Sequence, residues 1–253
     1  MTEELTDDRL LGGRIRFSQP AHGYRVAIDP VLLAAAVPAQ PGERVLDAGA
    51  GTGAASLCLA ARVPDCRIVG LELQRPLQRI ASHNVSQNGL DGRVEMIEGD
   101  LQRPPPRLAA ATFDHVMTNP PHHAAAETSP SPDRQRALAH TEAGLDLTGW
   151  LEGCLRMLKQ DGLLTLIHRA DRLGDLLGAL KDRAGDVVVF PLWPGGGRPA
   201  RRVVIQARKG ARGPLQLAPG LTLHDQSGGF RPRVEEILRN GRALDLREGW
   251  GDG

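Results

Sequence analysis

Cysteine is scarce in this sequence, and its few thiols form no metal or disulfide pattern. Only Cys58, Cys66 and Cys154 occur among 253 residues, and no two of them have Cys-x-x-Cys spacing. Three thiols cannot all pair within one chain, and structural zinc sites usually draw on closely spaced cysteine and histidine ligands. The sequence therefore disfavours a metal ion, and we expect a protein of a reducing compartment.

Long hydrophobic runs are also absent. The longest apolar run extends from Val31 to Val37, whereas a helix needs about 20 such residues to cross a bilayer. The acidic start, Met1 to Asp8, lacks the basic and apolar regions of a signal peptide. We therefore expect a cytoplasmic protein that does not associate with membranes.

Neither an excess of charge nor an abundance of aromatic residues is present. The chain has 31 basic and 30 acidic side chains, a net charge of +1, and a single tyrosine. Overall charge thus gives no argument for a nucleic-acid partner, and extensive base stacking is excluded. A chain of this length suits one α/β domain with extensions.

What the sequence does contain is a glycine-rich turn between an apolar strand, expected at 44–48, and a helix, expected at 54–62. The turn, Asp47 to Gly53, has glycine at every second position from Gly49. Glycine adopts backbone conformations closed to other residues and lets a ligand approach the chain closely, and the following helix offers unpaired N–H groups. The stretch is typical of a cofactor-binding loop, with a tight turn that binds nothing as the alternative.

Two ligands fit this loop. Gly49, Gly51 and Ala54 satisfy the G-x-G-x-x-A fingerprint of dinucleotide-binding proteins. Asp47, Gly49, Gly51 and Gly53 instead spell D-x-G-x-G-x-G, which resembles motif I of the class I S-adenosylmethionine methyltransferases. A carboxylate at Asp47 would repel a pyrophosphate and attract the ammonium group of S-adenosylmethionine. Charge complementarity therefore favours S-adenosylmethionine over NAD, although the loop alone leaves the question open.

Strands and helices alternate after this turn. Further strands are expected at 67–71, 94–97, 113–118, 162–168, 187–192 and 203–207, and further helices at 76–88, 145–159 and 173–183. The alternation predicts parallel strands, and the last two strands, joined by a loop without a helix, must be antiparallel. We therefore predict a Rossmann-like α/β sheet of seven strands, mostly parallel with an antiparallel last strand, and helices on both faces. The antiparallel last strand is typical of the methyltransferase form of this fold.

Shorter elements flank the predicted sheet. Gly13 to Phe17 and Gly23 to Ile28 are interpreted as a β-hairpin, and Asp29 is expected to cap a helix that continues to Val37. A small ribbon is expected within 215–224 and a terminal helix at 234–239. The predicted organisation is an N-terminal hairpin and helix extension at 1–40, a methyltransferase core at 41–212 and a C-terminal extension at 213–253.

Two acidic residues follow expected strands of this sheet. Glu72 ends the second strand of the alternation, 23 residues after Gly49, where its carboxylate can accept hydrogen bonds from ribose hydroxyls. Both candidate ligands carry a ribose, so Glu72 does not separate them. Asp100 follows the third strand and is interpreted either as a partner of an adenine amine or as an exposed turn residue.

The tetrapeptide from Asn119 to His122, Asn-Pro-Pro-His, follows the fourth strand. Its two prolines lack N–H groups and hold the chain rigidly, so that the Asn119 amide and the Pro120 carbonyl are presented as acceptors. An amine held by two acceptors loses lone-pair delocalisation into its ring and becomes a better nucleophile toward a methyl sulfonium. The motif therefore indicates methylation of a nitrogen, with a plain Asn-Pro-Pro turn as the alternative.

Together, the Asp47 to Gly53 loop and the Asn119 to His122 motif resemble the class I methyltransferases that carry N-P-P-[YFW] and modify exocyclic or amide nitrogens. Within that group, six segments resemble the bacterial tRNA(Val) adenine N6-methyltransferase family. They are 13–17, 22–25, 28–33, 166–169, 192–194 and 198–202. The resemblance spans roughly residues 9 to 240 and implies S-adenosylmethionine as cofactor and an RNA substrate, most simply an unpaired adenine of tRNA.

The resemblance also implies roles for individual residues. Cofactor-binding residues would be Asp47, Gly49, Gly51, Gly53, Glu72, Asp100 and Asn119. Catalytic residues would be Asn119, Pro120, Pro121 and His122. His122 departs from the family pattern because it stands where an aromatic residue is usual. A neutral imidazole can stack on a base, but it offers a smaller area.

A basic segment near the C-terminus is the only local sign of a phosphate-binding surface. Six cations and no acidic side chain lie between Arg198 and Arg212; they are Arg198, Arg201, Arg202, Arg208, Lys209 and Arg212. This basic stripe suits a nucleic-acid backbone, with a solvated hairpin whose arginines pair elsewhere as the alternative. The segment from Ala124 to Arg136 has no periodicity and is interpreted as a loop that closes over substrate or as a disordered one.

Other functions fit the same motifs. A protein-glutamine N5-methyltransferase or an rRNA guanine N2-methyltransferase would also present two amine hydrogens to Asn119 and Pro120. A non-catalytic RNA adaptor that binds S-adenosylmethionine is the alternative from another class.

Overall fold

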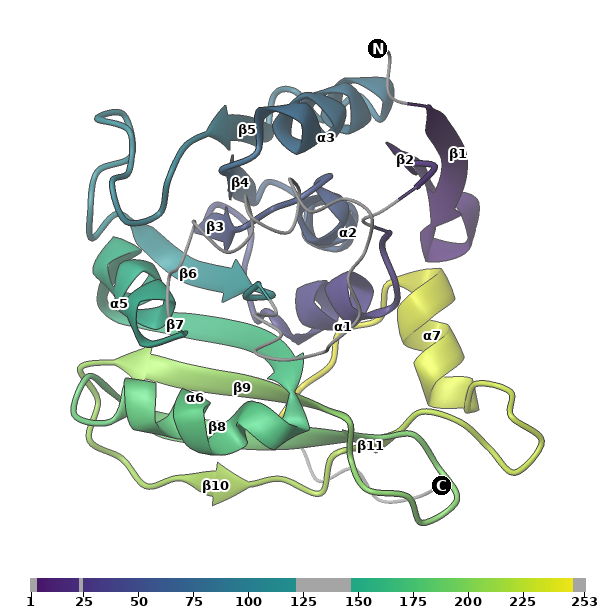
Figure 1. Ribbon diagram of the computed structural model, residues 1–253, viewed down its shortest axis with the longest axis vertical. Coiled ribbons are helices and arrows are strands. Elements are labelled where there is room, and N and C mark those ends of the chain that lie inside the picture. Colours follow the sequence, from purple (N-terminus) through teal and green to yellow (C-terminus); the bar gives the residue numbers. More distant parts are fainter. Residues whose placement is uncertain (1–3, 23–24, 122–146, 248–253) are drawn as a thin grey trace, which may run out of the picture.

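The computed structural model describes residues 4–22, 25–121 and 147–247. A large mixed sheet runs through these residues, and helices cover both of its faces (Figure 1). Five strands run parallel in the order β5-β4-β3-β6-β7: β3 (Arg44–Ala48), β4 (Arg67–Glu72), β5 (Val94–Glu98), β6 (Phe113–Thr118) and β7 (Leu158–Arg169). Their apolar runs are nearly continuous because strands of a parallel sheet are buried on both faces.

The sheet continues beyond β7 with an antiparallel strand. β9 (Arg202–Lys209) lies between β7 and β8 (Ala184–Trp193) and is antiparallel to both. This arrangement confirms the predicted class I methyltransferase sheet, with its seven principal strands and antiparallel last strand. Two short strands, β10 (Gln216–Leu217) and β11 (Leu221–Thr222), bring the sheet to nine. Each of them pairs in parallel with β8, so the predicted ribbon within 215–224 was wrong.

Alternate residues of the strands point into two separate cores. Val45 belongs to a core that also contains residues of α1 (Asp29–Ala36), α2 (Ala54–Arg62), α3 (Arg75–Gln87) and α7 (Pro232–Asn240). Its neighbour Leu46 belongs to a core with residues of α5 (Leu147–Met157) and α6 (Leu173–Leu180). The period of two in a strand therefore explains why helices are needed on both sides. No helix among the described residues is long and apolar enough to cross a membrane.

The N-terminal hairpin lies earlier in the chain than the sequence indicated. Its strands are β1 (Leu5–Leu10) and β2 (Ile15–Pro20), joined by the short 3-10 helix η1 (Leu11–Gly13). Gly12 and Gly13 have φ angles of 63° and 96°, which supply the turn. The predicted hairpin at 13–17 and 23–28 was wrong, because the glycine pair reverses the chain and recruits the polar segment before it as a strand.

Two asparagines of α3 fasten this hairpin to the main fold. The side-chain amide of Asn84 bonds the backbone N–H and carbonyl of Ser18, each at 2.8 Å, and Asn88 bonds the same two groups of Arg16 at 2.9 and 2.8 Å. Asn84 also donates to the carbonyl of Thr52 at 2.9 Å. The two side chains stand four residues apart, on one face of the helix, and match alternate residues of β2. The hairpin is thereby joined to the glycine-rich turn.

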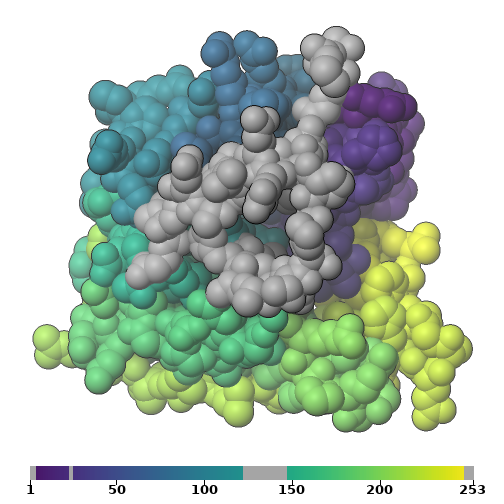
Figure 2. Space-filling view, in the orientation of Figure 1, coloured from purple at the N-terminus to yellow at the C-terminus, as the bar shows by residue number. Residues whose placement is uncertain are grey.

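The two halves of the chain occupy different parts of the molecule. In the view of Figure 2 the segments up to β6 form the upper part of the face and the green and yellow segments after β6 form the lower part. All five parallel strands end at the same edge of the sheet, as parallel pairing requires. In open α/β sheets this edge is the usual place for a ligand.

Candidate active site

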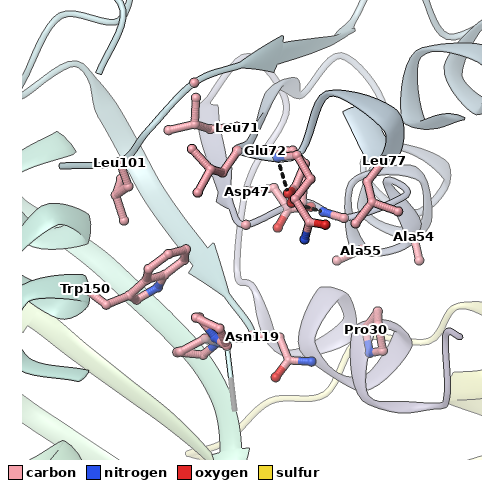
Figure 3. Close-up of a pocket in the computed structure, with 18 of the residues that line it drawn as sticks. Pro30, Asp47, Ala54, Ala55, Leu71, Glu72, Leu77, Leu101, Asn119 and Trp150 are labelled. Carbon is pink, nitrogen blue, oxygen red and sulfur yellow. Dashed lines mark hydrogen bonds between the residues drawn. The ribbon is translucent and has the colours of Figure 1, made fainter. Parts of the chain in front are cut away.

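A cavity of about 340 Å³ lies at that edge of the sheet. It is large enough for a small-molecule cofactor. Residues following four of the parallel strands line it, together with the start of α1 and one side chain of α5 (Figure 3). The predicted site residues that line it are Asp47, Gly49, Gly51, Glu72, Asp100, Asn119, Pro120 and Pro121. Residues from four separate strand ends, from Asp47 to Pro121, thus meet in one cavity.

The glycine-rich turn needs its glycines for backbone geometry and for close approach. Gly49 has a φ angle of 75°, and a Cβ atom there would lie 3.1 Å from the indole ring of Trp150. The Gly49 N–H donates to the Leu71 carbonyl at 2.9 Å, which ties the turn to the end of β4. Gly53 has a φ angle of 88° and precedes the first residue of α2, and it is not among the residues that line the cavity. The conformation of Gly53 serves the turn, and its role in cofactor binding stays a prediction.

Glu72 is held by backbone amides on both sides. Its Oε2 accepts the Gly51 N–H at 2.9 Å, and its Oε1 accepts the Gln74 N–H at 2.8 Å (Figure 3). The residue is only 7% exposed. These two bonds fix the orientation of the carboxylate at the cavity wall.

Asp47 is a buried carboxylate with a neutral partner. It is 2% exposed, and its Oδ2 accepts a hydrogen bond from the Ser56 hydroxyl at 2.7 Å. Burial raises the pKa of Asp47 to about 6; the Ser56 hydrogen bond opposes this shift and the nearby charge of Glu72 adds to it. A buried anion without a cation is costly. The site therefore favours a positively charged ligand group beside Asp47.

Asp100 lies in a turn at the cavity wall, and its contact with an adenine amine stays a prediction. It lines the cavity, and its Oδ1 accepts the Gln102 N–H at 2.8 Å, which is the hydrogen bond of an Asx turn. The turn holds the carboxylate at the cavity wall, where its other oxygen is available to a ligand amine.

Asn119 carries an acceptor without a donor. Its Oδ1 is buried and has no hydrogen-bond partner among the described residues. Figure 3 shows Asn119 in the cavity lining between Trp150 and Pro30. Buried side-chain oxygens are nearly always hydrogen-bonded, so an unpaired one in a cavity is the mark of a site that receives a donor from a ligand. His122 and the segment 124–136 lie outside the described residues.

Sequence reasoning missed Trp150 and Leu73. The Trp150 ring lines the cavity, and its Nε1–H donates to Thr118 Oγ1 at 3.0 Å. Its position in an amphipathic helix predicted only a core residue, and no motif distinguishes it. Leu73 also lines the cavity and is 53% exposed. A leucine left open directly after Glu72 forms an apolar wall that a flat ring could cover.

Comparison with known proteins places this cavity in a family. Residues 45–149 match the model described as "Methyltransferase domain", which includes the glycine-rich turn and Asn119. A relative from Aeromonas hydrophila named tRNA1(Val) (adenine(37)-N6)-methyltransferase is 32% identical over 215 residues, which are 84% of this chain and 88% of that protein. The chain belongs to the tRNA1(Val) (adenine(37)-N6)-methyltransferase family. The predicted resemblance is confirmed, and the protein is a methyltransferase.

Another member of this methyltransferase family comes from Bacteroides thetaiotaomicron. It is 33% identical over 151 residues, 58% of this chain and 60% of its own length. Among solved structures, a predicted O-methyltransferase from Agrobacterium tumefaciens has a TM-score of 0.72 and 26% identity, with 87% of this chain and 99% of that chain covered. The same fold therefore serves proteins named for different acceptor atoms, and the residues of the site must decide between oxygen and nitrogen.

Proposed function

We propose that this protein transfers a methyl group from S-adenosylmethionine to the N6 amine of an unpaired adenine in tRNA. One observation carries the proposal: Asn119 lines a cofactor-sized cavity, and its buried Oδ1 has no hydrogen-bond donor among the described residues. An acceptor in that place suits an amine, which has two hydrogens to give. The Asn119 oxygen does not suit an alkoxide or a carboxylate as the methylated group, because either anion would repel it. The family membership supports the same choice, because the relatives are named for the N6 atom of adenine.

The residues present fit S-adenosylmethionine. Asp47 provides a buried carboxylate for the ammonium group, and Glu72 provides an oriented carboxylate for the ribose hydroxyls. Gly49 leaves room beside Trp150 that any Cβ would fill. When bound, the cofactor supplies a methyl group carried by a positively charged sulfur. A pyrophosphate would meet Asp47 at close range, so the same geometry disfavours NAD.

Asn119 and Pro120 act on the acceptor amine. The Asn119 Oδ1 would accept one N–H of the amine, and the Pro120 carbonyl would accept the other. Both residues follow β6, so the sheet holds these two acceptors in a fixed relation to the glycine-rich turn after β3. Because two acceptors hold the amine hydrogens out of the plane of the ring, the nitrogen lone pair is no longer delocalised into the ring and becomes available for attack. Rigid positioning of this kind is worth several powers of ten in rate.

The proposed acceptor is a base that lies outside a duplex. The relatives are named for adenine 37 of tRNA1(Val), and an unpaired base reaches a cavity without most of the cost of leaving a double helix. The purified protein should therefore methylate an unmodified tRNA transcript more efficiently than a duplex RNA of similar length.

Nucleoside mass spectrometry tests the proposal. An unmodified tRNA pool incubated with the protein and methyl-labelled S-adenosylmethionine should yield labelled N6-methyladenosine, and tRNA from a deletion strain should lack the same nucleoside at one position. Label in N2-methylguanosine of rRNA, or in the side-chain amide of a protein glutamine, would instead support one of the alternative enzymes. Cofactor binding without label in any of them would support the RNA adaptor.

A further inference from the structure

The basic stripe of the sequence is divided between two opposite edges of the sheet. β9 is antiparallel to β7, so its first residue lies at the edge where β7 ends and its last residue lies at the edge where β7 begins. Eight residues separate the two edges, which is about 25 Å at roughly 3.3 Å per residue. Figure 1 shows β6 and β7 pointing one way and β9 the other. Only half of the stripe can therefore lie near the cavity.

The first half of the stripe is at the cavity edge. Arg202 pairs with Arg169, the last residue of β7, and its Nε donates to Asp29 Oδ2 at 2.8 Å. Asp29 is the first residue of α1, and the next residue, Pro30, lines the cavity. Asp29 thus binds Arg202 instead of capping the helix as the sequence predicted. Arg198 and Arg201 lie in the turn between β8 and β9, at this same edge.

The second half of the stripe is at the far edge and is partly engaged there. Arg208 donates to the Asp161 carbonyl at 2.8 Å and lies 3.6 Å from Asp186. Lys209 donates to the Leu158 carbonyl at 2.8 Å. Arg212 is exposed and has no ion pair or side-chain hydrogen bond with another described residue. These residues cannot contact a molecule whose reacting base is in the cavity unless it wraps around the whole sheet.

The cations of the β8–β9 turn have no acidic partner among the described residues. Arg201 is exposed and its side chain makes no ion pair there, and Arg198 donates only to the carbonyls of Pro194 and Gly195. Arginines elsewhere at this edge are neutralised: Arg172, in the 3-10 helix η2 (Ala170–Arg172) after β7, bonds Asp175 at 2.6 Å. An arginine without an acidic partner can bind a phosphate and release its water and counterion, whereas a paired arginine would first have to break its ion pair.

An exposed tryptophan accompanies these cations. Trp193 is the last residue of β8 and is 36% exposed. Its Nε1–H donates to the Pro219 carbonyl at 3.0 Å, so the ring is held in one orientation on the surface. Leu192 pairs with Arg202, and continuing that register by one residue places Trp193 across from Arg201. An aromatic ring held beside free arginines is the combination that binds single-stranded nucleic acid.

We propose that the β8–β9 turn, through Trp193, Arg198 and Arg201, contacts the RNA whose adenine enters the cavity. The two arginines bind backbone phosphates, and the Trp193 ring stacks on an unpaired base next to the target. The proposal rests on the proposed function, since it takes the substrate to be RNA. Charge complementarity and the position at the cavity edge select RNA over a protein substrate, which would have no regular array of anions to match free arginines.

A matched pair of arginines tests the electrostatic part. Arg201→Ala should raise KM for tRNA several-fold, leave kcat nearly unchanged, and reduce the slope of log affinity against log salt by roughly 0.7 to 0.9. Arg212→Ala removes the same charge from the same stripe at the far edge, and it should change neither quantity. Calorimetric affinity for S-adenosylmethionine should equal wild type in both variants, which shows that the fold is intact. Equal slopes for Arg201→Ala and Arg212→Ala would overturn the proposal.

The tryptophan has its own readout. The fluorescence of wild type should be quenched when tRNA binds, and Trp193→Phe should lose the part of that quenching that Trp150 in the cavity does not contribute, while binding tRNA with little loss. Trp193→Ala should bind several-fold more weakly. Full quenching in Trp193→Phe together with unaltered binding in Trp193→Ala would show that Trp193 does not contact the RNA. Failure of the wild type to methylate any tRNA would count against the proposed function. If the wild type methylates tRNA and Arg201→Ala and Arg212→Ala change this activity equally, the result counts only against this surface.

Discussion

The indole Nε1 of Trp150 lies 3.0 Å from Thr118 Oγ1, and the same hydroxyl donates to the carbonyl of Ala48 at 2.8 Å. Thr118 ends β6 and Ala48 ends β3, so this pair of hydrogen bonds joins α5 to the two strand ends that precede Asn119 and Gly49. The strand end before Asn119, the proposed acceptor for the amine, and the strand end before the glycine-rich turn are therefore held together by one hydroxyl. Trp150 serves as a positioning residue that also closes one wall of the cavity.

Trp150→Phe should slow methyl transfer more than it weakens cofactor binding. The substitution keeps an aromatic wall but removes the N–H that orients Thr118, so kcat should fall roughly tenfold, about 1.4 kcal/mol, with less than threefold change in S-adenosylmethionine affinity. Single-turnover kinetics and calorimetry measure the two quantities. Trp150→Ala, which also removes the wall beside Gly49, should lose both. Equal losses in kcat and affinity for Trp150→Phe would mean that the ring only packs.

Asn119→Ala should abolish methyl transfer and leave cofactor affinity and stability intact. Removal of a buried oxygen that has no donor among the described residues costs none of their hydrogen bonds, so the melting temperature should not fall. S-adenosylmethionine affinity by calorimetry should stay within about threefold, because the acceptor acts on the amine and on the reacting geometry. Wild-type turnover in this variant would move the reaction elsewhere in the cavity.

Asp47→Asn should make the free protein more stable and the cofactor complex weaker. The pKa of Asp47 is raised to about 6 by burial. The contribution of this group to stability is therefore complete below its unfolded value near 3.8 and is lost as the pH rises through about 6. Asparagine keeps an acceptor for Ser56 and carries no charge, so the variant should gain up to roughly 2 to 3 kcal/mol at pH 8 and almost nothing at pH 4. Chemical denaturation at the two pH values measures the gain.

The same carboxyl predicts a pH dependence of binding. A cationic ligand group favours the ionised carboxylate, so S-adenosylmethionine affinity of the wild type should decline as the pH falls below about 6. Asp47→Asn should bind weakly at every pH and show no such decline. Wild-type affinity that is constant between pH 5 and 8 would show that Asp47 does not face the ammonium group.

His122 remains a prediction from the sequence. If its ring stacks on the target base, His122→Ala should lower kcat/KM ten- to hundredfold, since stacking is worth roughly 1 to 3 kcal/mol per base. His122→Tyr should equal or exceed wild type and lose any dependence of activity on protonation near pH 6.5. A fully active His122→Ala would direct attention to His123. An inactive His122→Tyr variant together with an active His122→Ala variant would favour a glutamine amide over adenine as the methyl acceptor.

The parts of the fold that the sequence predicted are those where local pattern and tertiary structure agree. The strand at 44–48 and the helix at 54–62 were placed at their observed bounds, because an apolar run, a glycine-rich turn and an alanine-rich helix leave few alternatives. The hairpin was misplaced because the alternation in β1 is between exposed and half-buried polar residues, which resembles a loop. Its pairing comes from Gly12, Gly13 and the asparagines of α3.

The site was predicted where residues share a strand end, and missed where they come from elsewhere. Asp47, Glu72 and Asn119 each end or follow a strand, so the parallel topology alone brings them together. Trp150 belongs to α5, which packs on the sheet in the core that contains Leu46. Only this packing brings the ring to the cavity. The division of the basic stripe follows from the antiparallel direction of the last strand, which the sequence predicted, but the partners of Arg208 and Lys209 at the far edge come from the packing alone.

The hydrogen bonds from Asn84 and Asn88 to the hairpin affect how the protein behaves at high concentration. Among the strands that the structure describes, β2 pairs only with β1, and a strand with a free edge is a template for pairing with another chain. Asn84 and Asn88 occupy the N–H and carbonyl groups of Ser18 and Arg16 on the free side. The side chains of a helix thus take the place of a neighbouring strand, and that edge is closed to strand addition and to the self-association that an open hairpin would invite.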